Sequence, residues 1–239
     1  KQNRFVISMC NDPIVEPAEL GFRYREMAEA NFTLVSSTAW LTPAAARKWN
    51  EPTRMGHVQT ALQAAEQAGL AFMGAVLDPG FDNVTGLFPH ANSSLLDSSS
   101  PAMWGWLLAD EPSPPAQFYM LRRMRAAIDQ LRPDKLSFVN LLPNYAFPRN
   151  GPTGNWSSYE QYVDFFIATY KPQVLCFDHY PWFEVGDAAP FTPSTWAYPL
   201  STLDGYRQNL ALIRSKALAN GNIPFWNYFN TIPYQIHRD

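Results

Sequence analysis

Two adjacent carboxylates, Asp110 and Glu111, follow the apolar run 104–109 and are themselves followed by Pro112. A run of this kind predicts a buried strand that the proline ends. Successive side chains of a strand point to opposite faces, so one carboxylate can face a site while the other braces the loop. A carboxylate placed in a site can exchange protons with a substrate. The competing interpretation is that both carboxylates favour the N-terminus of the following helix.

A second set of ionisable side chains, Asp178, His179 and Tyr180, follows the apolar run 173–177. A carboxylate beside an imidazole and a phenol can tune proton transfer. Because neighbouring residues of a strand face opposite ways, only Asp178 and Tyr180 would share a face. The alternative is a hydrogen-bonded strand end without chemistry. Asp178 is therefore the candidate second carboxylate.

Amides and aromatic rings end most of the other predicted strands. Amide and carboxylate groups hydrogen-bond to hydroxyls, and aromatic rings stack on flat faces, so this collection suits a sugar ligand. Taken one at a time, each residue is as readily explained by packing or by a loop. The candidate sugar contacts are Asn11, Trp40, Asp110, Asn140, His179, Tyr180, Trp226 and Asn227.

The chain alternates between short apolar runs and stretches with helical spacing of apolar residues. Strands that are apolar throughout are typical of a parallel sheet covered by helices on both faces. The expected strands are residues 5–10, 32–35, 70–77, 104–109, 136–140, 173–177 and 224–229. The expected helices are residues 19–30, 53–69, 113–130, 159–170 and 203–219.

This alternation favours an α/β fold, a (β/α)8 TIM barrel with its site at the C-terminal ends of the strands. A doubly wound sheet is the competitor, but the first strand lacks the Gly-rich phosphate turn. An eighth strand and its helix are not recognisable. We therefore expect a single barrel domain over residues 1–239 that lacks its last strand and helix. Two long loops, residues 81–101 and 181–199, are expected to shape the cleft.

The run 104–109 with its Asp-Glu-Pro triplet resembles the fourth strand of clan-A-type glycoside hydrolases, in which Asn-Glu-Pro carries the general acid/base glutamate. The Asp-Glu-Pro form is similar to that of agarase-like and β-galactosidase-like barrels. The runs 177–181 and 224–228 extend the resemblance over nearly the whole chain.

The resemblance implies an O-glycosidase of a poly- or oligosaccharide, in which Glu111 is catalytic and protonates the glycosidic oxygen. The pKa of Glu111 would then need raising by a dry setting, to which Trp104 and Trp106 could contribute.

The chain departs from that family at the seventh strand, which places a nucleophilic glutamate in clan-A enzymes and here carries Asn227 and Asn230. An amide cannot attack a sugar. Asp178 could replace the nucleophile at about 5–5.5 Å from Glu111, or activate a water at about 6.5–9.5 Å. Two alternatives stay open: the second carboxylate lies in a missing C-terminal part, or the barrel binds carbohydrate without cleaving it. A scaffold without a sugar site is a third.

Composition excludes several partners. With 46% hydrophobic residues over 239 positions the chain can bury a sizeable core, and with a net charge of −3 and no basic cluster it is not a nucleic-acid binder. No apolar stretch reaches the roughly 18–20 residues of a membrane helix. Aromatic residues make up 15%, which suits stacking on sugars or an aromatic core equally. The oligomeric state is left open.

No metal or cofactor is expected, because the four histidines lack metal-ligand spacing and no phosphate-binding motif occurs. Cys10 and Cys176 lie in apolar runs and are predicted to be buried thiols. The chain begins without Met, so we expect a processed chain or an excised domain. The expected setting is extracellular or the secretory pathway, and the protein is expected to be a glycoprotein. Four Asn-x-Ser/Thr triplets, at Asn31, Asn83, Asn92 and Asn155, would permit glycosylation.

Overall fold

The structure of the chain is a computed structural model. It describes residues 6–9, 16–36, 51–75, 99–147, 156–181, 183–184, 203–229 and 234–235. Two units are formed, one by residues 1–109 with 123–137 and the other by residues 110–122 with 138–239. The expectation of one domain over residues 1–239 stays a prediction.

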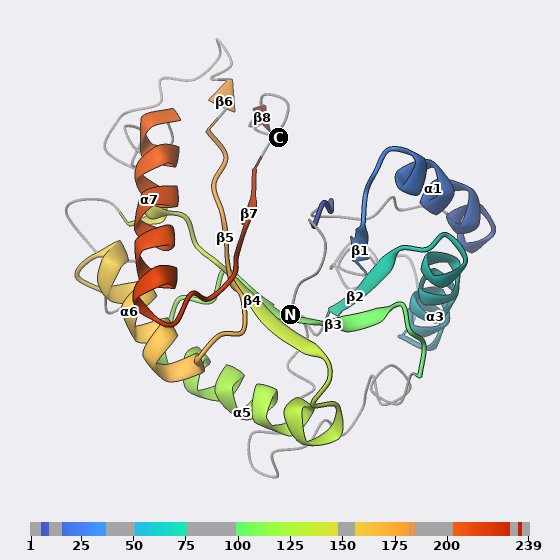
Figure 1. Cartoon of the computed structure of the whole chain (residues 1–239), viewed down its shortest axis with the longest axis horizontal. Coiled ribbons are helices and arrows are strands. Elements are labelled where there is room, and N and C mark those ends of the chain that lie inside the picture. The colour runs from blue at the N-terminus through green and yellow to red at the C-terminus, as the bar shows by residue number, and fades with distance from the viewer. Residues whose placement is uncertain are drawn as a thin grey trace. The chain divides into compact units, whose positions relative to one another are not determined.

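The first unit combines three parallel strands with two helices that lie together beside them (Figure 1). The helices are α1 (Pro17–Glu29) and α3 (Glu51–Gln67). The strands are β1 (Leu34–Ser36), β2 (Ala71–Ala75) and β3 (Met103–Asp110), and each pairs in parallel with the next. The core between helices and strands is apolar and includes the fully buried Leu20, Tyr24, Val35, Ala65 and Phe72.

The second unit holds the strands that carry most of the candidate site. β5 (Leu175–Asp178) pairs in parallel with β4 (Leu136–Leu141) on one side and with β7 (Phe225–Tyr228) on the other. Helices α6 (Tyr159–Tyr170) and α7 (Leu203–Ala219) pack against each other beside these strands (Figure 1). The remaining elements are α5 (Pro115–Leu131), which begins in this unit, and the short helix η2 (Asn144–Ala146).

The strand order of the main sheet is β1-β2-β3-β4-β5-β7, so neighbouring strands follow one another along the chain. In a doubly wound sheet the order would reverse at an internal strand, whereas consecutive parallel strands alternating with helices are the wall of a (β/α)8 barrel. The predicted fold class is therefore confirmed. Two further short strands, β6 (Phe183–Glu184) and β8 (Tyr234–Gln235), pair with each other in a separate sheet. The expected loss of the last strand and helix stays a prediction.

The strand predicted at residues 5–10 is wrong over its described part, residues 6–9, which has no strand assignment. Ile7 hydrogen-bonds to Thr33 at the start of the β1 segment, with its N–H 2.9 Å from Thr33 Oγ1. Its carbonyl accepts from the N–H groups of Thr33 and Leu34. Ile7 and Met9 are 39% and 38% exposed, so this apolar run lies at an edge instead of in the core.

The aromatic residues of the second unit gather into one layer between α5 and α6. Phe118 of α5 lies 5.4–6.0 Å, centroid to centroid, from the rings of Trp156, Tyr162, Phe165 and Phe166. We call these five residues the aromatic cluster. Pairs at such distances add about 0.5–1.5 kcal/mol each beyond the area they bury. Part of the high aromatic content is thus explained by packing.

Gly105 in β3 tests the packing of the first unit. An added Cβ would overlap the backbone carbonyl of Leu136, which cannot move aside as a side chain could. We expect Gly105→Ala to lower the free energy of unfolding by about 3 kcal/mol or more. Gly56→Ala in α3 is the control, because nothing lies within 4 Å of its Cβ position and alanine favours a helix. Urea denaturation followed by circular dichroism measures both, and equal stability of the two variants would contradict this packing.

Candidate active site

The candidate site lies within the second unit, at the carboxyl ends of the strands. Asp110 is the last residue of β3 and Glu111 follows it, while Asp178 is the last residue of β5. Asn140, next to last in β4, is in register with Cys176 of β5. Carboxyl ends of parallel strands meet at one edge of the sheet, which is where barrel enzymes carry their catalytic groups.

The backbone of Glu111 turns sharply where β3 ends. Its φ of 51° lies in the left-handed region, which costs a non-glycine residue about 1–3 kcal/mol. Among the described residues three other non-glycines have positive φ, and Asn31, Lys171 and Asn222 all follow helices, where such angles are common. The Glu111 N–H donates to the carbonyl of Asn140 at 2.9 Å, which ties this turn to β4.

The carboxyls of Glu111 and Asp178 lie close enough to shift each other's pKa, while Asp178 Oδ1 has no hydrogen-bond partner among the described residues. Burial of Asp178, whose residue is 2% exposed, raises its pKa to about 9, with the negative charge of Glu111 as the next cause. Glu111 is an exposed residue, but its carboxyl lies among enough protein atoms to lose hydration, and this raises its pKa. The interaction with Asp178 acts the other way on Glu111 and lowers its pKa, so Asp178 is the member of the pair that holds a proton more strongly.

Asp110 is the third carboxylate of the site. It is exposed, and its charge helps to raise the pKa values of both Glu111 and Asp178. Asn140 is 3% exposed and donates from Nδ2 to Asp110 Oδ1 at 2.9 Å. The Cys176 thiol lies 3.5 Å from Asn140 Oδ1 and donates to it, which fixes the orientation of that amide. Cys176 is thus the buried thiol predicted from the sequence.

Glu111 and Asp178 influence each other's pKa, so the two carboxyls are neighbours at this edge. The carboxylate separations expected for retaining and inverting glycosidases stay predictions. The two carboxylates of the Asp-Glu-Pro triplet do not lie in the first turn of α5, which has no acidic residue and begins at Pro115. The helix-capping interpretation therefore does not describe this strand end.

His179 is fully buried behind Asp178 and held by a polar network. Its Nδ1 lies 3.1 Å from Asn209 Oδ1, and the same oxygen accepts from the backbone N–H of Asn144 at 2.8 Å. Asn209 Nδ2 donates to Tyr159 Oη at 3.0 Å. Since the atom facing the Asn144 N–H must be an acceptor, His179 Nδ1 has to carry a proton in order to bond to it. The neutral ring is therefore the Nδ1–H tautomer.

The other described sugar-contact candidates lie in β7 and just after β5. Trp226 is half-buried in β7, with its ring edge-to-face on Phe138 at 5.3 Å. Asn227 is also half-buried, and its side chain accepts from Tyr206 Oη at 2.9 Å and donates to two backbone carbonyls. Tyr180 is partly buried just after β5.

Some predicted residues lie outside the described part of the chain. They are Asn11, Trp40, Cys10, Asn83, Asn92, Asn155, Asn230 and most of the two long loops. Trp104 and Trp106 belong to the first unit, where Trp106 is fully buried and Trp104 half-buried. Asn31, the one described glycosylation triplet, is exposed after α1.

Sequence reasoning missed the side chains that support the site from the helices. Tyr162 of α6, Asn209 of α7 and Trp156 hydrogen-bond to segments at the carboxyl edge, and Tyr159 of α6 accepts from Asn209. In the sequence the two tyrosines look like ordinary core of an apolar helix. Asn209, at a buried position of α7, was the one available signal, because a fully buried amide needs partners.

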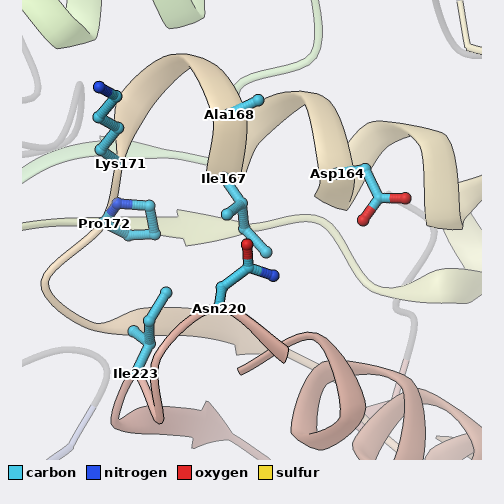
Figure 2. A pocket seen from close by; sticks show the side chains of 7 residues that line it. All are labelled: Asp164, Ile167, Ala168, Lys171, Pro172, Asn220 and Ile223. Carbon is cyan, nitrogen blue, oxygen red and sulfur yellow. The ribbon is translucent and has the colours of Figure 1, made fainter. Parts of the chain in front are cut away.

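A separate hollow of about 420 Å³ lies at the opposite edge of this unit. Figure 2 shows the end of α6 with Ile167 pointing toward Asn220, which follows α7, while the Lys171 side chain points away. Since Pro172 and Ile223 precede β5 and β7, this hollow marks the amino ends of those strands. It is thus remote from the carboxyl pair.

Comparison with known proteins places the fold. No protein-family model and no curated protein matches the sequence. Among solved structures, the endo-1,4-β-mannanase of Rhizomucor miehei is 11% identical with a TM-score of 0.53, covering 90% of this chain and 72% of that one. A putative α-L-fucosidase of Bacteroides thetaiotaomicron is 12% identical with a TM-score of 0.57, covering 93% of this chain and 71% of that one. An endo-β-1,4-mannanase of Thermotoga petrophila is 10% identical with a TM-score of 0.51, covering 100% of this chain and 70% of that one.

These similar structures are glycoside hydrolases, and at such identities the likeness shows the fold alone. The chain therefore has the TIM-barrel fold of glycoside hydrolases. The agarase-like and β-galactosidase-like detail of the resemblance stays a prediction. Within the residues that the structure describes, no three acidic, His or Cys side chains are grouped to hold a metal ion, and no helix could cross a membrane.

The raised pKa of Asp178 predicts a dependence of stability on pH. Between pH 4 and pH 9 the folded protein keeps a proton on Asp178 that the unfolded chain releases, because the ordinary pKa is 3.8 and the folded one about 9. The free energy of unfolding should therefore fall as pH rises through this window, by at most about 1.4 kcal/mol per pH unit. Asp178→Asn should remove that slope in urea titrations. Asp204→Asn on exposed α7 should keep it, and an unchanged slope in Asp178→Asn would refute the buried proton.

Nitrogen NMR can test which tautomer His179 adopts. In protein labelled with ¹⁵N on histidine, near pH 8, we expect a protonated Nδ1 and an unprotonated Nε2 for His179. Asn209→Leu removes the acceptor and should leave a mixture of tautomers. Observing the Nε2–H form in the unaltered protein would show that the network around Asn209 is oriented otherwise.

Proposed function

We propose that this chain is a glycoside hydrolase that cleaves O-glycosidic bonds of a poly- or oligosaccharide through Glu111. The observation that carries the proposal is the pairing of an exposed Glu111 with a buried, protonated Asp178 at the carboxyl edge of a barrel sheet. In TIM-barrel enzymes the chemistry occurs at that edge. The TIM-barrel fold is shared with known glycoside hydrolases and raises the expectation without deciding it.

The two carboxyls take unequal parts because they differ in exposure. Glu111 is exposed and meets the glycosidic oxygen, whereas Asp178, 2% exposed, reaches substrate only through Glu111. As the C–O bond breaks, Glu111 takes the proton from Asp178 and passes it to the departing oxygen. The pair is then fully ionised and accepts a proton from the water whose hydroxyl adds to the anomeric carbon. Proton transfer of this kind contributes about 10²–10⁴-fold to a rate.

The surrounding polar and aromatic groups supply carbohydrate contacts in this proposal. The exposed carboxylate of Asp110, oriented by Asn140, accepts hydrogen bonds from sugar hydroxyls. The half-buried ring of Trp226 offers an apolar face, and Tyr180 and Asn227 lie at neighbouring strand ends. His179 acts from behind, and Asn11 and Trp40 complete the predicted contacts. The partner is a carbohydrate and not a nucleic acid, and the setting is extracellular or secretory.

The substrate class is best sought among β-linked polysaccharides. Two of the similar structures are named as β-mannanases and one as a putative α-L-fucosidase. A β-1,4-mannan, an agarose, a β-galactan and an α-fucosylated oligosaccharide therefore form the first panel. Which of them is turned over identifies the sugar.

The second candidate is a barrel that binds carbohydrate without cleaving it. One observation favours it: β7 carries no carboxylate, and its sequence is Phe-Trp-Asn-Tyr. Calorimetry on the same panel separates the candidates. Binding without release of reducing sugar by the full-length protein would support this second function and overturn the first.

Glu111→Gln tests the hydrolytic role. The amide keeps the shape of the side chain but cannot deliver a proton, so we expect hydrolysis to fall by about 10²-fold or more. Sugar binding measured by calorimetry should change little. Glu29→Gln, on the exposed end of α1, is the matched control and should keep full activity. Full activity in Glu111→Gln would remove Glu111 from the mechanism.

A further inference from the structure

The turn that carries Glu111 is held by two buried aromatic side chains that lie outside the carboxyl pair. Tyr162 of α6 donates its hydroxyl proton to the carbonyl of Pro112 at 2.9 Å. Trp156, just before α6, donates its indole N–H to the carbonyl of Ser113 at 2.6 Å. The two residues directly after Glu111 are thus each fixed by one hydrogen bond from the helix layer.

The Tyr162 hydroxyl also joins the ends of two strands. It accepts from the backbone N–H of Leu142, directly after β4, at 3.3 Å while it donates to Pro112. Glu111 in turn donates its own N–H to Asn140 in β4 at 2.9 Å. One hydroxyl therefore sets the spacing between the chain that follows β3 and the chain that follows β4, and Glu111 lies between these two fixed points.

Neither aromatic side chain can move easily, because both are buried. Tyr162 is fully buried and Trp156 is 4% exposed. Their rings lie 5.6 Å apart, and both lie against Phe118 of α5, at 5.5 and 5.8 Å. An N–H or O–H held inside a packed layer keeps a fixed direction, so the carbonyls it contacts are held as firmly as the layer itself.

A glutamate whose backbone is in the left-handed region needs such restraint from its neighbours. A non-glycine residue at a φ of 51° relaxes to an ordinary conformation unless its neighbours prevent it. Relaxation would swing the Glu111 carboxyl away from Asp178. The charge of Glu111 also contributes to raising the pKa of Tyr162, after burial, which indicates that the phenol and the carboxylate lie near each other.

We infer that Tyr162 and Trp156 are positioning residues, which clamp the Pro112 and Ser113 carbonyls and thereby hold the Glu111 carboxyl against Asp178. For turnover the inference rests on the proposed glycosidase function. For the geometry of the carboxyl pair it stands without that function.

The test compares conservative variants of one helix layer. Tyr162→Phe and Trp156→Phe each remove one donor and keep an aromatic ring. Tyr170→Phe is the matched control, since Tyr170 is a buried tyrosine of the same helix that stacks on Phe166 at 5.0 Å. Near-UV circular dichroism verifies that each variant keeps its packing, and if Tyr162→Phe does not fold, Trp156→Phe carries the test.

The first readout is the titration of the carboxyl pair, followed by ¹³C NMR of the Glu and Asp carboxyls. With Glu111 released, Asp178 loses a neighbouring charge, so its pKa should fall in both Phe variants and not in Tyr170→Phe. A wild-type titration in folded Tyr162→Phe and Trp156→Phe would overturn the inference, whether or not the protein hydrolyses sugars.

The second readout is turnover on the substrate that the polysaccharide panel identifies. Tyr162→Phe should lower kcat about tenfold with little change in KM, and should shift the pH profile, because only the position of the proton donor changes. In a Glu111→Gln background the same substitution should have no further effect. An equal loss in both backgrounds would mean that Tyr162 acts on something other than Glu111. Unchanged activity in Glu111→Gln itself would defeat the proposed function but not the titration result.

Discussion

The electrostatic interaction between the carboxyls of Glu111 and Asp178 has to cross one intervening strand, because β4 lies between β3 and β5 in the sheet. Neighbouring strands are about 4.8 Å apart, so the two strand ends begin roughly 10 Å from each other. A regular continuation of β3 would leave the glutamate over its own strand. The left-handed turn at Glu111, bonded through its N–H to Asn140, carries the side chain across β4 instead. Backbone strain is thus the condition on which the carboxyl pair depends.

Burial of Asp178 imposes a second condition. An ionised carboxylate that is 2% exposed would need a cation or several donors, and neither appears among the causes that determine its pKa. Two described cations of this unit pair with other carboxylates: Lys216 with Glu160 and Asp164, and Arg207 with Asp204. Keeping a proton is the remaining way to bury this group. The raised pKa of Asp178 therefore follows from the packing of the unit and from the charge of Glu111 beside it.

Local sequence patterns predicted the bounds of helices well where the signals within one segment agreed. Residues 159–170 and 203–219 become α6 and α7 with the predicted bounds, because apolar spacing, the Ser158 cap and the terminal turns agree. The strand prediction for residues 5–10 was wrong, since hydrophobicity indicates that a segment is buried but not whether it joins the sheet as a strand. The predicted strand ends put Glu111, Asn140 and Asp178 at the carboxyl edge of the sheet, and their roles stay predictions. The proximity of Glu111 to Asp178 was not predictable, because it depends on a single left-handed residue and on tyrosines that in sequence look like core.

The unequal exposure of the two carboxyls bears on how such a site could work without a carboxylate on β7. An exposed acid that is protonated only when its buried neighbour ionises can deliver one proton to the departing oxygen, and the ionised pair then regains a proton from the attacking water. A nucleophile on the far side of the sugar is then unnecessary, provided that water attacks the anomeric carbon directly. The pair keeps a single negative charge at neutral pH, and Asp110 adds a second beside it. A site with that balance suits neutral sugar rings and disfavours uronic acids, whose carboxylates it would repel.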